Sequence, residues 1–228
     1  MAGKSGARSP GNGLRRLVRV LRDEGPKAAA IKILHELGIY RRLHLLDIPN
    51  EEAATPAGSD LRIEVEVLRP DDVDEYLALR PDQGRAEIEQ RQREGHWCFV
   101  GRHEGRIVTS AWSCAESAEI EYLGCRLRLP PEAVFSYDVY TDPAYRGHRL
   151  STVVFDWRRR YLREAGYPRG VGILWPENRA AARRLAHRRH RIFGTLEAWD
   201  LGVWKRHVLR PHRDAVGDGF PGVAIEGE

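Results

Sequence analysis

The sequence contains few cysteines and no long apolar run. Its three cysteines, Cys98, Cys114 and Cys125, include no CxxC pair, so we expect neither a disulfide framework nor a zinc knuckle. No stretch approaches the roughly 18 consecutive apolar residues that a membrane-spanning helix needs. The first residues, MAGKSGARSPGNG, lack the apolar middle of a signal peptide. These absences predict a globular cytoplasmic protein with no transmembrane segment.

Lysine is also scarce, so arginine carries nearly all of the positive charge. Lysine occurs only at Lys4, Lys27, Lys32 and Lys205, and the 37 basic and 33 acidic residues leave a formal net charge of +4. Guanidinium groups suit phosphate recognition, although a GC-rich genome also favours arginine without any functional reason. The small positive excess favours anionic ligands only weakly and does not imply a nucleic-acid partner.

The length of 228 residues allows one core and a small appendage. We expect a disordered N-terminus over 1–13, a basic amphipathic helical appendage over 14–46, a linker over 47–60, one domain over 61–210 and a flexible tail over 211–228. The appendage could contact an acidic membrane surface, but packing against the domain is the more common arrangement. We expect its deletion, residues 1–46, to leave ligand binding by the domain intact.

Within the domain, the apolar period alternates between strand and helix values. The predicted order is a strand over 61–69, helices over 70–79 and 85–94, a hairpin over 96–115, strands over 120–127 and 133–141, a helix to 165, a strand over 171–175, a helix from 179 and a bent or paired strand over 193–209. This order predicts an α/β fold with a mixed sheet, whose central β-α-β step runs over 133–175.

The run DPAYRGHRLSTVVFDW, residues 142–157, leads from a strand directly into a helix. The N-terminus of a helix presents unpaired N–H groups and a partial positive charge, so anions bind there. The turn adds groups that suit an anion: Arg146, Gly147, His148, Arg149, Ser151 and Thr152. From these features alone, an ordinary strand-to-helix turn with solvated arginines stays open as the alternative.

The segment VYTDPAYRGHRLS resembles the pyrophosphate-binding motif of the GNAT superfamily of acyl-CoA N-acyltransferases. Pro143, Tyr145, Arg146 and Gly147 stand where the phrase V-x-P-x-Y-R-G-x-G places them. There are two departures from the motif. Arg149 replaces its middle glycine, and a serine, Ser151, occupies its last small-residue position.

A second segment, WPENRAAARRL, resembles the family's N-x-x-S/A stretch through Asn178 and Ala181. The resemblance covers about residues 62–208 and includes the order of the elements. It implies a GNAT-like fold, to which this chain adds the helical N-terminal appendage.

The resemblance implies that acetyl-CoA or another acyl-CoA is the co-substrate, with no metal. The pantetheine arm would pair with backbone groups of Val139 and Thr141. The pyrophosphate would lie on the amides that run along the turn: Arg146, Gly147, His148, Arg149, Leu150 and Ser151. Asn178 would either hydrogen-bond the pantetheine or cap its own helix.

Acyl transfer to an amine needs a base, a donor to the oxyanion and a proton for the leaving thiolate. Asp138 is the predicted base, acting directly or through water, and a structural hydrogen-bond acceptor is the alternative. Strand alternation places Asp138 and Tyr140 on one face and Val139 and Thr141 on the other. A separation of the strands at this point would need a bulge near Asp138. Glu119 and Glu121 are weaker candidates for the base.

The proton donor is the least certain of these groups. The family's tyrosine, seven residues after the asparagine, is replaced here by Leu185. Tyr140 or Tyr137 could substitute, although a strand tyrosine more often serves packing, and solvent could also protonate the thiolate. The HRRH run at 187–190 has two histidines at metal-ligand spacing without a third ligand, and a solvated basic face is the simpler interpretation.

The sequence therefore predicts an N-acyltransferase that moves an acetyl or other acyl group from acyl-CoA to a primary amine. A small-molecule amine or amino sugar is a more probable acceptor than a protein. Two alternatives remain open: a non-catalytic CoA-binding regulatory module, and an aminoacyl or peptidoglycan-type transferase that uses tRNA.

Overall fold

The structure is a computed structural model that describes residues 30, 33–50, 58–176, 190–212 and 222–226. Its main sheet has eight strands, in the order β10 (Lys205–Pro211), β9 (Arg191–Asp200), β1 (Tyr40–Pro49), β8 (Arg169–Leu174), β7 (Ala133–Thr141), β4 (Arg106–Ala115), β3 (Trp97–His103) and β2 (Glu64–Val67). Neighbouring strands are antiparallel except β7 and β8, which are parallel. The predicted mixed α/β sheet is confirmed.

Helices cover both faces of the sheet. On one face, the 3-10 turn η1 (Pro70–Asp72) leads into α3 (Val73–Leu79), and α4 (Arg85–Arg93) follows. Tyr76 and Ile88 from these helices are fully buried against the sheet, together with Trp112. The crossover helix α5 (Leu150–Glu164) packs on the opposite face, where Val154 and Leu162 contact the core around Phe99.

A second, smaller sheet packs on the same core as β1, β8 and β9. Its strands are β5 (Ser117–Ile120), β6 (Cys125–Arg128) and β11 (Ala224–Ile225). The single strand expected over 120–127 is wrong, because a turn that includes Gly124 at φ 66° divides this region into a hairpin. The flexible tail expected over 211–228 is wrong for residues 223–225, because Val223 is buried and β11 pairs with β6.

The appendage prediction is wrong for residues 40–46, as is the linker prediction for residues 47–49, because together they form β1. Gly38, at φ 74°, ends the preceding helical turn with hydrogen bonds of the Schellman type. Leu43 and Leu45, two residues apart, are completely buried against the small sheet, and after a register shift at Leu45 the next residues, Leu46 and Ile48, are buried in a separate cluster. Strand β1 is thus an internal strand, paired with both β8 and β9.

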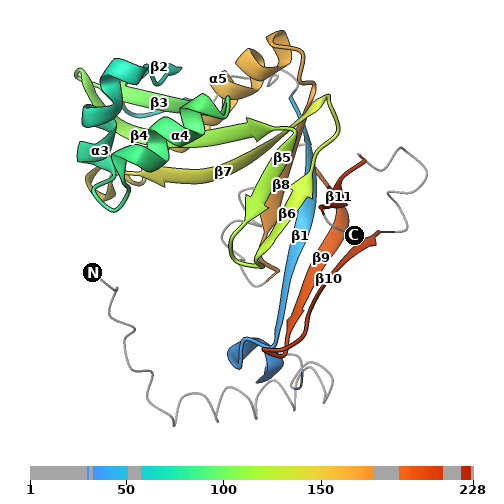
Figure 1. Ribbon diagram of the computed structural model, residues 1–228. Helices are drawn as coiled ribbons and strands as arrows, with labels where there is room; N and C mark the ends of the chain where they lie inside the picture. Colours follow the sequence, from blue (N-terminus) through green and yellow to red (C-terminus); the bar gives the residue numbers. More distant parts are fainter. Residues whose placement is uncertain (1–29, 31–32, 51–57, 177–189, 213–221, 227–228) are drawn as a thin grey trace.

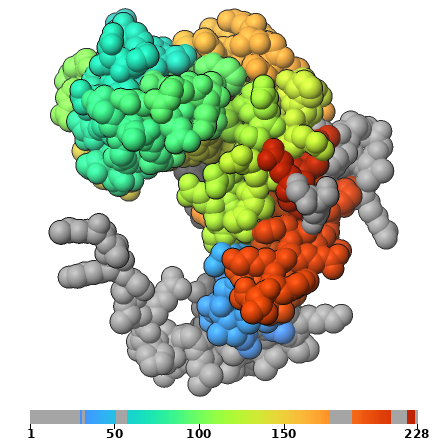
Figure 2. All heavy atoms as spheres, in the orientation of Figure 1, coloured from blue at the N-terminus to red at the C-terminus, as the bar shows by residue number. Residues whose placement is uncertain are grey.

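Figure 1 shows the resulting shape. Strands β1, β9 and β10 extend together away from α3 and α4 as a tongue that ends near residues 33–37. Figure 2 shows the same strands as a narrow projection from the broader body. The remaining predicted elements are confirmed: β2 within 61–69, η1 with α3, α4, the β3–β4 hairpin, β7, α5, β8 and the paired strands β9 and β10. The helix expected from residue 179 lies outside the described residues.

Candidate functional site

Strand β7 contains a bulge at Asp138. This residue has a left-handed backbone, with φ of 48°, which is uncommon for a residue other than glycine. The register against β4 shifts at the same place, since Tyr137 pairs with Trp112 while Tyr140 pairs with Ser110. Two residues of β7 therefore stand opposite one residue of β4, which bends the strand.

Strands β7 and β8 separate after Phe135, just before the bulge. They pair only where Ala133–Phe135 meets Arg169–Val171. Past that point β7 continues along β4 as far as Thr141, and β8 continues along β1 as far as Leu174. The two parallel strands thus form a splay, closed at one end and open toward their C-termini.

The backbone groups of Val139 and Thr141 face this splay. Tyr140 accepts a hydrogen bond of 2.9 Å from Thr109 Oγ1, and the Asp142 amide donates to a β4 carbonyl at 2.9 Å. Because successive residues of a strand direct their N–H and C=O groups to opposite sides, those of Val139 and Thr141 point away from β4. The Thr141 carbonyl accepts from Arg146 Nε at 3.2 Å, so the Thr141 amide and the backbone groups of Val139 are the ones positioned to pair with an extended ligand lying between β7 and β8.

Two large apolar side chains are exposed at the splay. Val139 on β7 has 59% of its surface exposed, and Trp175, directly after β8, has 44%. The Trp175 ring meets the Tyr122 ring of the β5–β6 turn edge to face, with centroids 5.4 Å apart. The open end of the splay therefore combines a free backbone edge with apolar surface, as ligand sites commonly do.

The loop after β7 turns the chain into α5. It begins with the 3-10 turn η2 (Pro143–Tyr145), where the Asp142 carboxylate accepts a hydrogen bond from the Ala144 amide. Gly147 and Arg149 both have left-handed backbones, with φ of 93° and 62°. Within the described part of the chain, the amides of residues 147–151 donate to no carbonyl or side chain. They form a cluster of unsatisfied donors at the positive end of a 15-residue helix.

The side chains of this loop do not all point toward one anion site, as the motif would imply. Arg146 folds back so that Nε donates to the Thr141 carbonyl at 3.2 Å. His148 Nδ1 and Arg149 each lie 3.8 Å from the carboxylate of Asp60. The Leu150 side chain is buried in the core, which leaves only its amide for a ligand. Ser151 is half-buried in the first turn of α5.

Asp138 is held by three donors from the α3–α4 region. Its two oxygens accept from Arg80 at 2.6 Å, from Gln83 at 2.6 Å and from Arg91 at 3.1 Å. Burial alone would raise the pKa of Asp138, but the hydrogen bonds from Arg80 and Gln83 and the charge of Arg80 outweigh it, so the pKa lies below its ordinary value of 3.8. This carboxylate is charged at neutral pH and fully engaged, which favours the structural alternative over the predicted base.

The same arginines lie over the aromatic rings of β7. Arg80 is 4.7 Å from the ring centre of Tyr140, and Arg91 is 5.3 Å from that of Tyr137. Asp138 and Tyr140 therefore share one face of the strand, as alternation predicts. Because of the bulge, Tyr137 lies on this face as well.

A pair that the sequence did not indicate lies beside the bulge. His96 Nδ1 and the Tyr137 hydroxyl are 2.6 Å apart. Burial lowers the pKa of His96 below 6.5, and burial also raises the pKa of Tyr137 above its ordinary value. His96 follows α4 by three residues, so only the fold brings it to β7, and no spacing in the sequence relates the two residues.

Comparison with known proteins identifies the architecture. No protein-family model and no curated protein matches the chain. Among solved structures, a GCN5-related glucosamine N-acetyltransferase region of a fungal multi-domain GH3 β-N-acetylglucosaminidase matches 82% of this chain and 23% of its own, at 12% identity and a TM-score of 0.50. The chain has the GNAT fold. The expected fold class is thus confirmed.

Other solved structures similar to this GNAT-fold chain include two further acetyltransferases. A putative GNAT-family acetyltransferase from Novosphingobium aromaticivorans is 17% identical, with 69% of this chain and 62% of the other covered and a TM-score of 0.49. An acetyltransferase from Trypanosoma brucei is 23% identical, with 57% and 95% covered and a TM-score of 0.41.

The remaining predicted site residues are Glu119, Glu121 and Asn178. Glu119 and Glu121 belong to the β5–β6 hairpin, where Glu119 faces Arg126 at 3.9 Å. Asn178 and Leu185 lie outside the described residues. No helix in the described ranges is long and apolar enough to cross a membrane.

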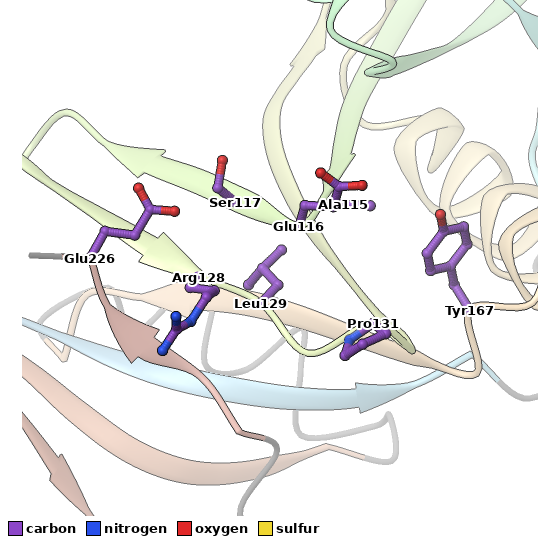
Figure 3. A pocket seen from close by; sticks show the side chains of 8 residues that line it. All are labelled: Ala115, Glu116, Ser117, Arg128, Leu129, Pro131, Tyr167 and Glu226. Carbon is purple, nitrogen blue, oxygen red and sulfur yellow. The ribbon is translucent and has the colours of Figure 1, made fainter.

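A cavity of about 460 Å³ lies at the closed end of the two parallel strands, away from the splay. Figure 3 shows side chains of the small sheet on one side of it, including Arg128 and Glu226, and Tyr167 on the other. Its three charged lining residues, Glu116, Arg128 and Glu226, are all exposed. The splay, with its aligned backbone donors, remains the candidate site.

Proposed function

We propose that this protein is an N-acyltransferase that moves an acetyl or other acyl group from acyl-CoA to the primary amine of a small molecule. One observation carries the proposal: the splay beside the Asp138 bulge opens next to the unsatisfied amides of residues 147–151. A thioester with a long polar arm and a diphosphate needs both features, an extended backbone edge and an anion site at its end.

In this proposal, the pantetheine arm pairs with the backbone of Val139 and Thr141. The diphosphate binds the amides of Gly147, His148, Arg149, Leu150 and Ser151, where the helix dipole favours negative charge. The Arg146 amide, predicted to join them, donates instead to the Pro143 carbonyl at 3.4 Å, so Arg146 contributes through its positive charge. Arg149 has 67% of its side chain exposed, so it can turn outward and leave its amide accessible despite replacing a glycine. Of the two roles that the sequence leaves open for Asn178, this proposal assigns it the hydrogen bond to the pantetheine.

The chemistry is direct attack on a thioester. The amine nitrogen, once deprotonated, bonds to the carbonyl carbon; the carbon–sulfur bond then breaks, and the sulfur leaves as a thiol after taking a proton. The amide of Val139 at the bulge donates to the oxyanion that develops on the carbonyl.

The lowered pKa of Asp138 makes it a weak base. We assign Asp138 the structural role of stabilising the bulge through its hydrogen bond with Arg80. Tyr140 stabilises the position of Arg80, because the guanidinium group lies over the Tyr140 ring. The proton carrier is then the His96–Tyr137 pair, because His96 is neutral at neutral pH and shares a hydrogen bond with Tyr137. Tyr137 directly precedes the bulge and can pass a proton between His96 and the reacting groups.

The acceptor is best described as an amine on a small molecule or an amino sugar. The fungal region with the same fold is named as a glucosamine N-acetyltransferase. The exposed Trp175 ring beside the splay suits the apolar face of a sugar ring.

Binding is tested by calorimetry with acetyl-CoA on the full chain. Arg146→Glu and Gly147→Asp should each weaken binding by about tenfold or more, because both bring a negative charge to the diphosphate site. The matched control is Arg160→Glu, an exposed residue far along the same helix, which should bind like the wild type. Unchanged affinity in the first two variants would remove the phosphate site from the proposal.

Transfer is tested by thiol release with acetyl-CoA and a panel of amines and amino sugars. Tyr137→Phe should lower kcat and shift its pH profile while leaving the affinity for acetyl-CoA unchanged, since the ring and its packing are kept. Equal rates and profiles for the variant and the wild type would exclude the pair as the proton carrier. Binding of acetyl-CoA without thiol release on any amine would instead support the regulatory-module alternative.

A further inference from the structure

The exposed apolar side chains of the described residues fall in two places. Seven large hydrophobic residues are exposed, and two of them, Val139 and Trp175, flank the splay. The other five gather at the end of the tongue: Ile33, Leu37, Leu201, Val203 and Trp204. We call these five residues the tip. Since large apolar side chains are rarely exposed together without a function, the tip needs a separate explanation.

The backbone brings the two halves of the tip together. Leu201, Val203 and Trp204 form the turn between β9 and β10, and Val203 is completely exposed. The Asp200 amide donates to the Ile39 carbonyl at 2.8 Å, which joins this turn to the helical turn that carries Ile33 and Leu37. Figures 1 and 2 show this end projecting away from the body of the molecule.

A basic and aromatic surface adjoins the tip, which we call the flank. Trp199, Trp204, Arg206, Val208 and Arg210 line a shallow cavity of about 330 Å³ on β9 and β10. Arg206 stands opposite Trp199 in the strand register and makes no ion pair with the described residues. Counting residues 33–42 and 197–210, this end of the protein has five basic side chains against three acidic ones.

From this arrangement we propose that the tip and flank dock the protein onto an anionic lipid bilayer. Apolar residues that project furthest enter the interface, tryptophans reside at the headgroup level, and arginines and lysines bind lipid phosphates. The apolar residues of the β9–β10 turn come first at the projecting end, and Arg206 and Trp199 follow side by side in the strand register. Lys205 lies 3.0 Å from the Asp200 carboxylate, so Arg206 is the basic side chain that this surface offers to a lipid phosphate. The anchoring is peripheral, through a hairpin.

A second copy of the chain is a poorer partner for this surface. A two-fold contact through the tip would bring the flank of one copy close to the flank of the other, and like charges repel. An anionic bilayer instead offers both the apolar phase for Val203 and the negative charge for Arg206. Charge complementarity therefore favours the lipid surface.

The experiment is co-sedimentation of the full chain with vesicles of equal parts phosphatidylglycerol and phosphatidylcholine, and with vesicles of phosphatidylcholine alone. The wild type should bind the anionic vesicles more tightly, and added NaCl should weaken that binding. Val203→Asp should lower the partition coefficient by about tenfold or more, because an exposed apolar group becomes charged. Arg206→Gln should lower it about fivefold, the effect expected for one basic charge.

Two controls match these changes in chemistry but lie on the body. Ala86→Asp on α4 and Arg160→Gln on α5 change exposed residues, and both should bind vesicles like the wild type. The proposal is overturned if the wild type does not sediment with anionic vesicles, or if Val203→Asp binds as well as the wild type, which would indicate a polyanion-binding face. Light scattering that finds a dimer dissociated by Val203→Asp would also overturn it, in favour of a second copy.

Discussion

Two residues with left-handed backbones determine the local geometry of the site. Asp138 sits at the bulge that bends β7 along the open part of the splay, and Arg149 is the residue before the first turn of α5. Neither is a glycine, so each conformation carries a cost that neighbouring contacts must offset. For Asp138 those contacts are strong, because Arg80, Gln83 and Arg91 bind its carboxylate. For Arg149 they are weak, with only a 3.8 Å approach to Asp60.

The strain at Arg149 predicts a difference between two substitutions that remove the same charge. Arg149→Gly should be more stable than Arg149→Ala by about 1 kcal/mol, because glycine adopts a positive φ without the steric penalty of a Cβ. Urea unfolding of both variants measures the difference. An alanine variant at least as stable as the glycine variant would show that the left-handed conformation at this position is not retained.

The contacts of Asp138 predict the behaviour of Asp138→Asn. Loss of the carboxylate charge leaves Arg80 and Arg91, whose side chains are only 9% and 15% exposed, with Asp82 and Glu87 as their remaining carboxylate partners. It should cost about 2 kcal/mol in the free energy of unfolding, because two charge-assisted hydrogen bonds are weakened. The measurement is chemical unfolding at neutral pH. Gln83→Ala, which removes one neutral donor and leaves both ion pairs, should cost clearly less; a larger cost for Gln83→Ala would contradict the assignment.

The same carboxylate predicts a pH dependence. The pKa of Asp138 is lower in the folded state than its ordinary value of 3.8, so the folded state binds its proton less readily than the unfolded state. Its stabilising contribution is complete above about pH 4 and is lost as the pH falls from there through the folded-state pKa. Unfolding free energies measured toward pH 2 should therefore fall more steeply for the wild type than for Asp138→Asn. If the two proteins lost stability equally with falling pH, the lowered pKa of Asp138 would not be the cause.

At the scale of elements, the least expected feature is β1. It enters the sheet between β8 and β9, so a segment from the N-terminal part of the chain completes the core of the domain. The expectation that residues 1–46 are dispensable no longer holds, because their removal would take away most of a strand with neighbours on both sides. The three strands of the tongue depend on one another in the same way, since β1 joins the β9–β10 hairpin to the rest of the sheet.

The burial of β1 predicts a large effect from one substitution. Leu45→Ala should lower the free energy of unfolding by about 3 kcal/mol, because Leu45 is completely buried between the main sheet and the small sheet. Leu201→Ala provides the control, since it removes the same atoms from a side chain that is 56% exposed. Thermal or urea unfolding of both variants measures the contrast, and similar small losses would mean that β1 is not an integral strand.

At the scale of the whole molecule, the splay and the tongue are parts of one arrangement. From their closed end, β7 runs toward the helical body and β8 runs along β1 into the tongue, as Figure 1 shows. The tongue is therefore the continuation of one wall of the splay. If the tip docks on a bilayer as proposed, the proposed acyl-transfer site is held at a definite distance and orientation from the lipid surface.

Most of the element order could be predicted from the sequence, because the apolar period reports which residues face a core. The strand-to-helix turn was also predictable, since it depends on adjacent residues such as Gly147 and the first turn of α5, whereas phosphate binding there stays a prediction. A bulge near Asp138 could be predicted, because the separation of the strands requires one. The residues that bind the Asp138 carboxylate could not be predicted. Arg80 and Arg91 are 58 and 47 residues away in sequence, and nothing in their spacing relates them to Asp138.

The sequence by itself determined the local features: the period of each strand, the turn into α5 and the composition that excludes a disulfide framework. These depend on neighbouring residues, whose preferences act within a few positions of each other. Only the tertiary structure decided that residues 40–49 form an internal strand, that Asp138 is an engaged ion-pair partner and that His96 meets Tyr137. Each of these depends on surfaces distant in sequence, and the burial free energy that selects among such pairings arises only when the whole core assembles.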